Sequence, residues 1–455
     1  MTVVAEEDMS RSIWPSCPAL GWTAGVDKLT ARPTGTPLST PTGGFTLETH
    51  GPYQHGTGFP AVNGASNMQP VSSGMNGGMP IKIQPGTGTT VGLGKTNIFA
   101  SEFGSSVYSS FESMSPTLAK EHWGIHGGAP PDNCHGGFAS KCQGTNVMAQ
   151  RNYPCDNIID EYFGLADADA VGELVFKKQL WQCMVGQSLL LKSDIETRRS
   201  TNQFGIIVWQ LNEIWPTGGW GSIEYGTVTH TKGQVLGGRW KPLHHWYKKS
   251  IYSDVMATCG TVGGPDSNST DATLAKHTFA GGAACYVKND SPKPFKGTVD
   301  VSKISLSTGK VTSTQNVTVD MPAGAGVTHW FSVDGAINGA EEMLRVVVSD
   351  TDGTVTSDNP VPFAYPKNMK LPKAKVTVVV GEQLSNDSDA PVSITVTSDA
   401  LALYTTLTTL AQGRFEDNAF LMLPGTKTLK FFPFEGFDAA ELKSTIRVEH
   451  AALYM

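Results

Sequence analysis

The spacing of hydrophobic and polar positions changes near residue 255, which divides the chain into two kinds of structure. Before this point, short apolar runs predict buried strands at residues 97–104 and 204–212. Between them, apolar residues recur at three- and four-residue steps over residues 170–199, which predicts a long helix. A strand, a long loop, a helix and a second strand follow one another in a parallel α/β sheet or barrel.

After residue 255, apolar and polar residues alternate, and this period of two predicts antiparallel strands. Residues 297–301 and 344–348 show the alternation, and the second run leads into a hairpin turn at Asp352-Gly353. A proline-rich joint at residues 359–372 precedes another alternating region, in which valine and isoleucine at 392, 394 and 396 are separated by serine and threonine. Two sandwiches of about 100 residues each fit this length.

These patterns predict three domains. Residues 1–255 form an α/β unit, of which the first 95 residues are rich in glycine and proline and predict long loops. Residues 256–370 and 371–455 each form a β-sandwich. The fold class is therefore α/β followed by all-β.

Composition excludes several classes of protein. A hydrophobic fraction of 39% and a charged fraction of 16% are those of a folded chain, and the net charge of −7 gives no basic surface for nucleic acid. No apolar run approaches the length of a membrane span. The seven cysteines form no CxxC pair, and their odd number does not indicate a disulfide framework.

Four N-glycosylation sequons lie in the C-terminal half, at Asn268, Asn289, Asn316 and Asn386. They favour a secreted or lysosomal glycoprotein, although Pro292 makes the sequon of Asn289 the weakest. The first ten residues, MTVVAEEDMS, have neither the basic nor the apolar region of a signal peptide. We therefore expect the natural amino terminus to lie further upstream.

A carboxylate and several aromatic residues follow the predicted strands of the α/β unit. Glu102 ends the first strand, and burying an unpaired carboxylate there would be costly, so the alternatives are a salt bridge at the rim or catalysis. Trp209, Trp215 and Trp220 lie at or after the second strand with Asn212 and Glu213. Indole rings stack on sugar faces while amides and acids bind hydroxyls, so a sugar pocket is expected. The alternative is a tryptophan-rich core, which Trp209 would suit best.

Several ordered motifs resemble glycoside hydrolase family 2, closest to its β-mannosidase branch. The motifs are FASEFG (99–104), WQLNEIWPTGGWGSIEY (209–225), GRWKPLHHWYKKS (238–250), SRSIWPSCPALGW (10–22), ETHGPYQHGTGFPAVNG (48–64) and GRFEDNAFLMLPG (413–425). The resemblance implies the second half of a (β/α)8 TIM barrel followed by two immunoglobulin-like domains. It also implies a cofactor-free, retaining exo-β-glycosidase that removes terminal β-linked mannose from oligosaccharides.

The resemblance assigns roles to particular residues. Glu102 becomes the nucleophile, and the residues that hold the terminal sugar are His50, Tyr53, Trp209, Asn212 and Trp220. The family's acid/base is a glutamate that follows an asparagine upstream of the 10–22 motif, and no such pair occurs here. We therefore expect the acid/base to be absent from this chain and the chain alone to be inactive. Glu213 is the alternative acid, but the geometry of the catalytic site would then have to differ from that of the family.

Other chemistries and activities fit the sequence less well. The histidines and cysteines between His122 and Cys142 match no regular metal-ligand spacing, so no metal is assigned, and a Cys134–Cys142 bridge or free thiols are favoured. Ser222 is in no nucleophile elbow. The functional alternatives are an exo-β-glucosaminidase, a β-galactosidase, and a non-catalytic carbohydrate-binding or scaffold protein.

Overall fold

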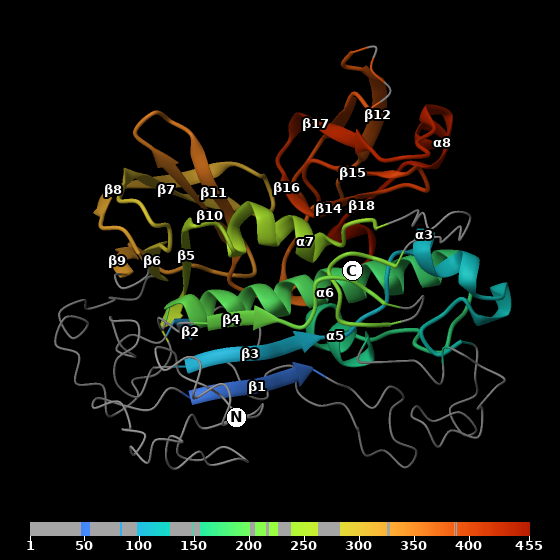
Figure 1. Cartoon of the computed structure of the whole chain (residues 1–455), viewed down its shortest axis with the longest axis horizontal. Helices are drawn as coiled ribbons and strands as arrows, with labels where there is room; N and C mark the ends of the chain where they lie inside the picture. Colours follow the sequence, from blue (N-terminus) through green and yellow to red (C-terminus); the bar gives the residue numbers. More distant parts are fainter. Residues whose placement is uncertain are drawn as a thin grey trace, which may run out of the picture.

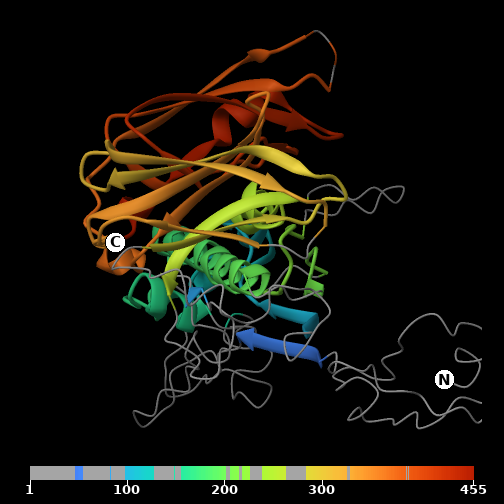
Figure 2. The same cartoon turned by 90° about the vertical axis from the view of Figure 1, so that its left-hand side faces the viewer.

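The computed structural model describes twelve segments of the chain, and its elements form one parallel sheet with helices and two pairs of β-sheets (Figures 1 and 2). The described residues are 47–54, 82–83, 98–127, 148, 155–200, 205–214, 218–225, 238–262, 283–324, 328–385, 387 and 389–455.

The parallel sheet contains β1 (Leu47–Gln54), β3 (Ile98–Ser105) and β4 (Gly205–Val208), in that order. The long helix α6 (Glu173–Ser200) covers it, and Ala100 and Phe103 of β3 pack against Leu191 and Ile195 of the helix. Both predicted strands and the predicted helix are therefore confirmed. The second strand is shorter than expected, because the chain leaves the sheet after Val208 instead of continuing to residue 212.

Short helices pack around α6. Three described strands do not close a barrel, so the half-barrel stays a prediction, while parallel strands under a helix are present as expected. The short elements are α3 (Phe111–Met114), η2 (Ser115–Thr117), η3 (Lys120–His122), α5 (Cys155–Tyr162), α7 (Pro242–Trp246) and the single π turn η5 (Tyr247–Ile251).

The middle β-region consists of two four-stranded sheets around an apolar core that includes Val287, Val299 and Val346. The hairpin predicted at Asp352-Gly353 is confirmed, with Gly353 at a φ of 81°. The joint begins later than predicted, because Asn359 and Pro360 lie inside a strand. One sheet has the order β11 (Val355–Pro362), β10 (Glu342–Asp350), β7 (Phe295–Ser305), β8 (Val311–Met321), and the other β2 (Lys82–Ile83), β5 (Val255–Val262), β6 (Ala283–Asn289), β9 (Thr328–Val333).

The C-terminal β-region has its own apolar core, formed by residues such as Val396, Leu429 and Phe431. The alternation predicted around Ile394 is confirmed, because every second residue of its strand is buried. One sheet has the order β12 (Val376–Gln383), β13 (Val392–Ser398), β17 (Gly425–Pro433), β15 (Gly413–Phe415). The other sheet has the order β16 (Phe420–Met422), β14 (Ala402–Thr408), β18 (Arg447–Glu449). The short helices of this part of the chain are η6 (Pro366–Asn368), α8 (Ala439–Thr445) and η7 (Ala451–Leu453).

The end of α6 carries charges into the junction with the middle β-region. Lys192 and Glu196 form an ion pair with both side chains almost fully buried. Thr258 Oγ1 and Asn359 Nδ2 each donate a hydrogen bond of 2.9 Å to the carboxylate of Glu196. Because those donors belong to β5 and β11, the pair ties the helix to both sheets of that region.

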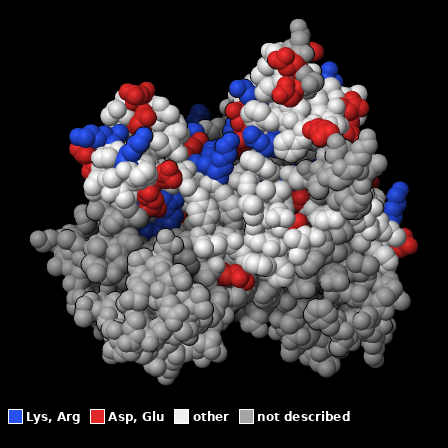
Figure 3. Space-filling view, viewed as in Figure 1, with Lys and Arg blue, Asp and Glu red and all other residues white. Residues whose placement is uncertain are grey.

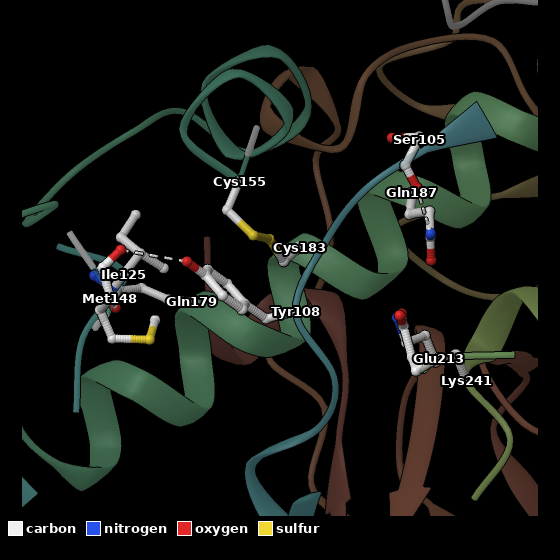
Figure 4. Close-up of a disulfide and its surroundings, with 10 residues drawn as sticks. All are labelled: Ser105, Tyr108, Ile125, Met148, Cys155, Gln179, Cys183, Gln187, Glu213 and Lys241. Carbon is white, nitrogen blue, oxygen red and sulfur yellow. Dashed lines mark hydrogen bonds and ion pairs between the residues drawn. A yellow bond between two sulfur atoms is a disulfide. The ribbon is translucent and has the colours of Figure 1, made fainter. Parts of the chain in front are cut away.

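Two disulfides join elements that are neighbours in space. Cys155 of α5 pairs with Cys183 of α6 (Figure 4), and Cys259 pairs with Cys285 directly across the β5–β6 ladder. These bridges correct the sequence-based expectation, because spacing along the chain carried no sign of either pair. Cys17, Cys134 and Cys142 lie outside the described residues. Across the segments that the structure describes, no helix combines the length and the apolar character needed to cross a membrane.

Candidate active site

Glu102 lies in β3 and is only partly buried, whereas its neighbour Phe103 is fully buried and packs towards α6. Across the parallel ladder, the Cα of Glu102 is the register partner of His50, and Gly104 is the partner of Tyr53. The side chains of His50 and Tyr53 lie outside the described residues. The backbone ladder places both positions beside Glu102 and Gly104 of β3.

Trp209 and Trp220 approach β3 from the other side. The backbone N–H of Trp209 donates to Phe103 O at 2.8 Å. A Cβ at Gly104 would lie 2.1 Å from Trp209 O and 3.2 Å from a ring carbon of Trp220, so only glycine permits this close approach. Trp209 is 41% exposed, and the idea that it fills a core is therefore wrong. Trp215 lies outside the described residues.

The segment after β4, residues 209–225, is held against the segment after β3; we call it the aromatic loop. Gly219 and Val107 exchange two backbone hydrogen bonds of 3.0 and 2.9 Å, and Glu213 N donates to Ile223 O at 2.8 Å. Asn212 is exposed, and its Nδ2 donates to Glu213 O at 3.1 Å. Asn212 is thus placed on the same loop as both tryptophans.

A fully buried ion pair lies behind the aromatic loop. Lys241 Nζ donates to Glu213 Oε1 at 2.5 Å, and neither side chain is exposed (Figure 4). A Cβ at Gly219 would lie 1.9 Å from Glu213 Oε2, so the loop closes directly over the carboxylate. Desolvation raises the pKa of Glu213 despite the charge of Lys241. A carboxylate enclosed in this way serves to position the loop and cannot reach a sugar, which argues against Glu213 as the acid.

Two further glutamates nearby are also buried and paired. Ser110 Oγ and Ser113 Oγ donate to Glu224 Oε2 at 2.6 and 2.5 Å. Glu112 accepts from Arg447 Nε at 2.6 Å, and although burial opposes the effect, this hydrogen bond and charge lower the pKa of Glu112. Sequence reasoning missed these pairs, because a buried glutamate and a surface one look alike without their partners.

Helix α6 supports β3 from behind. Gln187 Nε2 donates to Ser105 O at 2.7 Å, three residues beyond Glu102 (Figure 4). The guanidinium of Arg198 stacks 4.5 Å from the ring centroid of Phe103. Both contacts follow Glu102 in β3, so α6 anchors the strand directly beyond this residue.

Ser222 and His244 lie together, yet they do not form an exposed nucleophile. Ser222 Oγ is 2.9 Å from His244 Nδ1 and donates to Leu211 O at 3.0 Å, and Ser222 has no exposed surface. Burial lowers the pKa of His244. The pair fastens α7 to the aromatic loop, and Ser222 therefore has a structural role.

The histidine and cysteine cluster is described only in part. His126 Nδ1 is 2.7 Å from Asp169 Oδ1, and His122 Nδ1 is 3.0 Å from Gly127 O. Cys134, His135 and Cys142 lie outside the described residues. No group of three potential ligands converges among the residues that were placed, and the absence of a metal stays a prediction.

A pocket also lies elsewhere in the molecule. It is located between α6, α7 and the two β-regions and is lined by apolar residues such as Leu189 and Phe420 and by charged residues such as Lys192, Asp358 and Asp417. None of the residues of the proposed sugar site lines it. Glu102 is the better candidate for the chemistry, because the carboxylates that line this pocket, Asp358 and Asp417, are held in ion pairs with Arg345, Lys249 and Lys427.

The fold is thus that of a parallel α/β unit followed by two β-regions. Residues 371–452 match the family model of the immunoglobulin-fold domain of mannosidases. This match covers the C-terminal β-region and confirms that it has an immunoglobulin-like fold.

Curated relatives extend the likeness towards the amino terminus. The chain is 25% identical to the β-mannosidase of Capra hircus over 78% of this chain and 37% of the relative. It is 26% identical to the β-mannosidase A of Aspergillus niger over 53% of this chain and 25% of the relative. The chain therefore spans between a quarter and two fifths of the length of these proteins.

Solved structures give the same picture for the fold. The β-D-mannosidase of Dictyoglomus thermophilum superposes with a TM-score of 0.54 at 19% identity, covering 77% of this chain and 37% of that one. The exo-chitosanase of Amycolatopsis orientalis gives 0.52 at 14% identity, with 86% and 45% covered. The predicted resemblance is confirmed: the chain resembles the C-terminal part of glycoside hydrolase family 2, in its β-mannosidase branch.

Proposed function

We propose that the chain contributes the nucleophile and half of the sugar site of a retaining exo-β-glycosidase of the β-mannosidase type. Its natural substrate would be an oligosaccharide with a terminal β-linked mannose. We propose the same organisation as above, with half of a TIM barrel at residues 1–255 and sandwiches at 256–370 and 371–455.

One observation carries the proposal. Glu102 is a partly exposed carboxylate in β3, three residues before the strand ends, with His50 as its cross-strand partner and with Trp209 hydrogen-bonded to the next residue, Phe103. A carboxylate fixed in this way can attack the anomeric carbon of a sugar stacked on an indole ring. The roles of His50, Tyr53, Asn212 and Trp220 as sugar-binding residues belong to the same proposal.

We propose that the acid/base is absent from this chain, because no Asn-Glu pair precedes the 10–22 motif. Glu112, Glu213 and Glu224, the carboxylates closest to the aromatic loop, are buried in pairs with Arg447, Lys241 and two serines. In a retaining enzyme the acid/base stands about 5–5.5 Å from the nucleophile and protonates the leaving oxygen. The chain alone should therefore turn over ordinary mannosides very slowly, because their alkoxide leaving groups require that proton.

A substrate that needs no proton separates the nucleophile from the missing acid. With 2-deoxy-2-fluoro-β-mannosyl fluoride, a Glu102 oxygen bonds to the anomeric carbon while the C–F bond breaks and fluoride leaves with the electron pair. We expect intact-mass spectrometry to show one added fluoromannosyl group, and peptide mapping to place it on Glu102.

The control variants make the result specific. Glu102→Gln should abolish labelling, whereas Glu121→Gln, which changes an exposed glutamate, should leave it intact. Labelling of the wild-type chain on another residue, or undiminished labelling of Glu102→Gln, would contradict the assignment. Rapid hydrolysis of unactivated mannosides by the chain alone would show that it carries its own acid/base.

A non-catalytic carbohydrate-binding role is the second candidate, and the exposed face of Trp209 favours it. Titration with mannose, glucosamine and galactose oligosaccharides, followed by tryptophan fluorescence, measures binding without catalysis. Binding without labelling at Glu102 would support this role. Preference for glucosamine or galactose would favour the exo-β-glucosaminidase or β-galactosidase alternative.

A further inference from the structure

Two N-glycosylation sequons fall within the described residues, and their surroundings differ. Asn289 ends β6, and Asn316 lies in the middle of β8. Asn268 and Asn386 lie outside the described residues. The proposed glycosidase site involves neither asparagine, so these motifs raise a separate question of modification.

The side chain of Asn289 is fully buried, and its hydrogen bonds are all used. Its Nδ2 donates to Lys293 O at 2.9 Å and to Pro322 O at 2.8 Å, which occupies both amide hydrogens. Its Oδ1 accepts from the backbone N–H of Ser291 at 3.1 Å and from Ser291 Oγ at 2.8 Å. A sugar on Nδ2 would replace one of these hydrogens and would have no space.

Asn316 has the opposite environment. It is exposed, as is Thr318, while Val319 on the other face of the strand is buried in the core. Because side chains alternate along a strand, the asparagine and the threonine of this sequon point outward together. Asn316 Nδ2 donates to Asp300 Oδ1 at 2.6 Å. A glycosylated amide keeps one N–H, so this bond and the fold survive the modification.

The position of the strand gives the modification a physical consequence. β8 is the end strand of its four-stranded sheet and lies at the outside of the middle β-region (Figure 1). An exposed end strand is a template for pairing with other chains. A glycan in the middle of β8 would keep other chains away from this edge.

We propose that Asn316 carries an N-linked glycan and that Asn289 does not. The amide nitrogen of Asn316 forms a bond to the anomeric carbon of a lipid-diphosphate-linked oligosaccharide. The bond from that carbon to the phosphate oxygen breaks, the lipid diphosphate leaves with the electron pair, and the amide loses one proton. The disulfides Cys155–Cys183 and Cys259–Cys285 fit the oxidising compartment in which such transfer occurs.

Site-resolved peptide mapping tests the proposal. The full chain is directed into the secretory pathway of a eukaryotic cell by an added cleavable leader, and the soluble protein is treated with peptide N-glycanase in heavy-oxygen water. This treatment converts each glycosylated asparagine into a mass-labelled aspartate. We expect the label at Asn316 and none at Asn289.

Matched variants complete the test. Thr318→Ala should remove the label from residue 316 and leave the melting temperature of the deglycosylated protein within about 2 °C, because the site is on the surface. Asn289→Gln should keep the label at Asn316 and lower the melting temperature by roughly 5 °C or more, because four buried hydrogen bonds are lost. Unlabelled Asn316, or labelled Asn289, in the soluble wild-type protein would overturn the proposal.

Discussion

The interior around α6 and the aromatic loop differs from the interior of the C-terminal β-region in the kind of side chain that it buries. Around α6, ionisable residues such as Lys192, Asp194 and Glu196 are at most 3% exposed, and Glu213 and Lys241 are buried close by. The core of the C-terminal β-region is built from residues such as Ile394, Leu429 and Phe431. The first interior depends on exact pairing of charges, and the second on apolar area.

The two kinds of interior occur at different places in the molecule. Buried ion pairs add little net stability over apolar packing, but breaking one leaves a charge without a partner. Here such pairs lie where separate elements meet: Glu196 joins α6 to β5 and β11, and Arg447 joins the C-terminal β-region to α3. Apolar packing suffices within one sandwich, whereas charges fix how the regions fit together.

The junction between the two β-regions follows the same rule. Lys249 of η5 contacts Asp417 of the C-terminal β-region at 2.8 Å and Asp358 of the middle β-region at 3.7 Å, so one lysine bridges the two regions. Lys427 and Arg345 pair with the same two carboxylates at 2.6 and 2.9 Å. These pairs line an open crevice, and Figure 3 shows basic side chains gathered between the two β-rich lobes. Although burial opposes it, the charges of Lys249 and Lys427 lower the pKa of Asp417 to about 2, so these contacts persist at any ordinary pH.

The largest effect should come from removing a charge behind the aromatic loop. Lys241→Met leaves the fully buried carboxylate of Glu213 without its cation. We expect a loss of about 3–5 kcal/mol in the free energy of unfolding of this region. Tryptophan fluorescence during urea unfolding measures it, because Trp209 and Trp220 lie on the loop that the pair supports.

The double variant Lys241→Met with Glu213→Gln serves as the control for this prediction. Removing both charges should restore much of the stability lost in Lys241→Met, since no unpaired ion is left in the interior. If the double variant were as unstable as the sum of the single variants, the ion pair would not be the reason for the loss.

A smaller loss is expected in the apolar interior. Leu429→Ala removes a side chain that is 2% exposed in the C-terminal core, which should cost about 2–5 kcal/mol, most of it through the cavity left behind. Chemical denaturation at low and high salt should give the same loss, because no charge is involved. Val379→Ala, which truncates a residue that is 61% exposed in the same β-region, should change stability by less than about 0.5 kcal/mol.

The elements of the apolar interior were largely predictable from the sequence. The alternation around Val392, Ile394 and Val396 predicted a half-buried strand, and the apolar run that ends at Glu102 predicted β3, because burial repeats with the period of each element. The strand predicted for β4 ran four residues too far at its end, since apolar residues in the aromatic loop continue the pattern of the strand. The periodicity of apolar residues indicates which positions are buried, but it does not indicate where the hydrogen bonds between two strands end.

The candidate site was predictable in part and for a different reason. Glu102, Trp209 and Trp220 stand out because carboxylates and indoles at strand ends suit sugar chemistry. The pairing of Glu213 with Lys241 and the bridge between Cys155 and Cys183 depend on which elements touch, and residues 28 positions apart give no local signal of that contact. Tertiary packing alone decides such partners.

The charged interior should also make stability depend on pH, through Asp194. Burial raises the pKa of Asp194 to about 7, against the opposing charge of Arg198. A carboxyl whose folded pKa lies above its unfolded value near 3.8 binds the proton more tightly when folded, so stability falls as pH rises from about 4 to about 7. Calorimetry should show Asp194→Asn to be more stable than wild type at pH 8, by the order of a few kcal/mol, and equal to it near pH 4.

The control for this pH dependence is Asp334→Asn, which changes an exposed aspartate and should follow the wild-type curve at every pH. A wild-type curve with no slope between pH 4 and 7 relative to Asp194→Asn would mean that Asp194 is not held in its protonated form.

The smallest effect should come from an ion pair at the exposed start of the same helix. Lys177 and Glu173 are four residues apart on α6, 2.5 Å from each other, and the glutamate side chain is 54% exposed. Water and salt screen such a pair, so Lys177→Met should cost only about 0.3–0.5 kcal/mol, and less in high salt. Urea unfolding at two salt concentrations measures this change. Lys177 and Lys241 each have a glutamate partner at 2.5 Å, and the two pairs differ chiefly in their access to water. A loss of stability as large as that of Lys241→Met would therefore show that exposure does not determine how much an ion pair contributes.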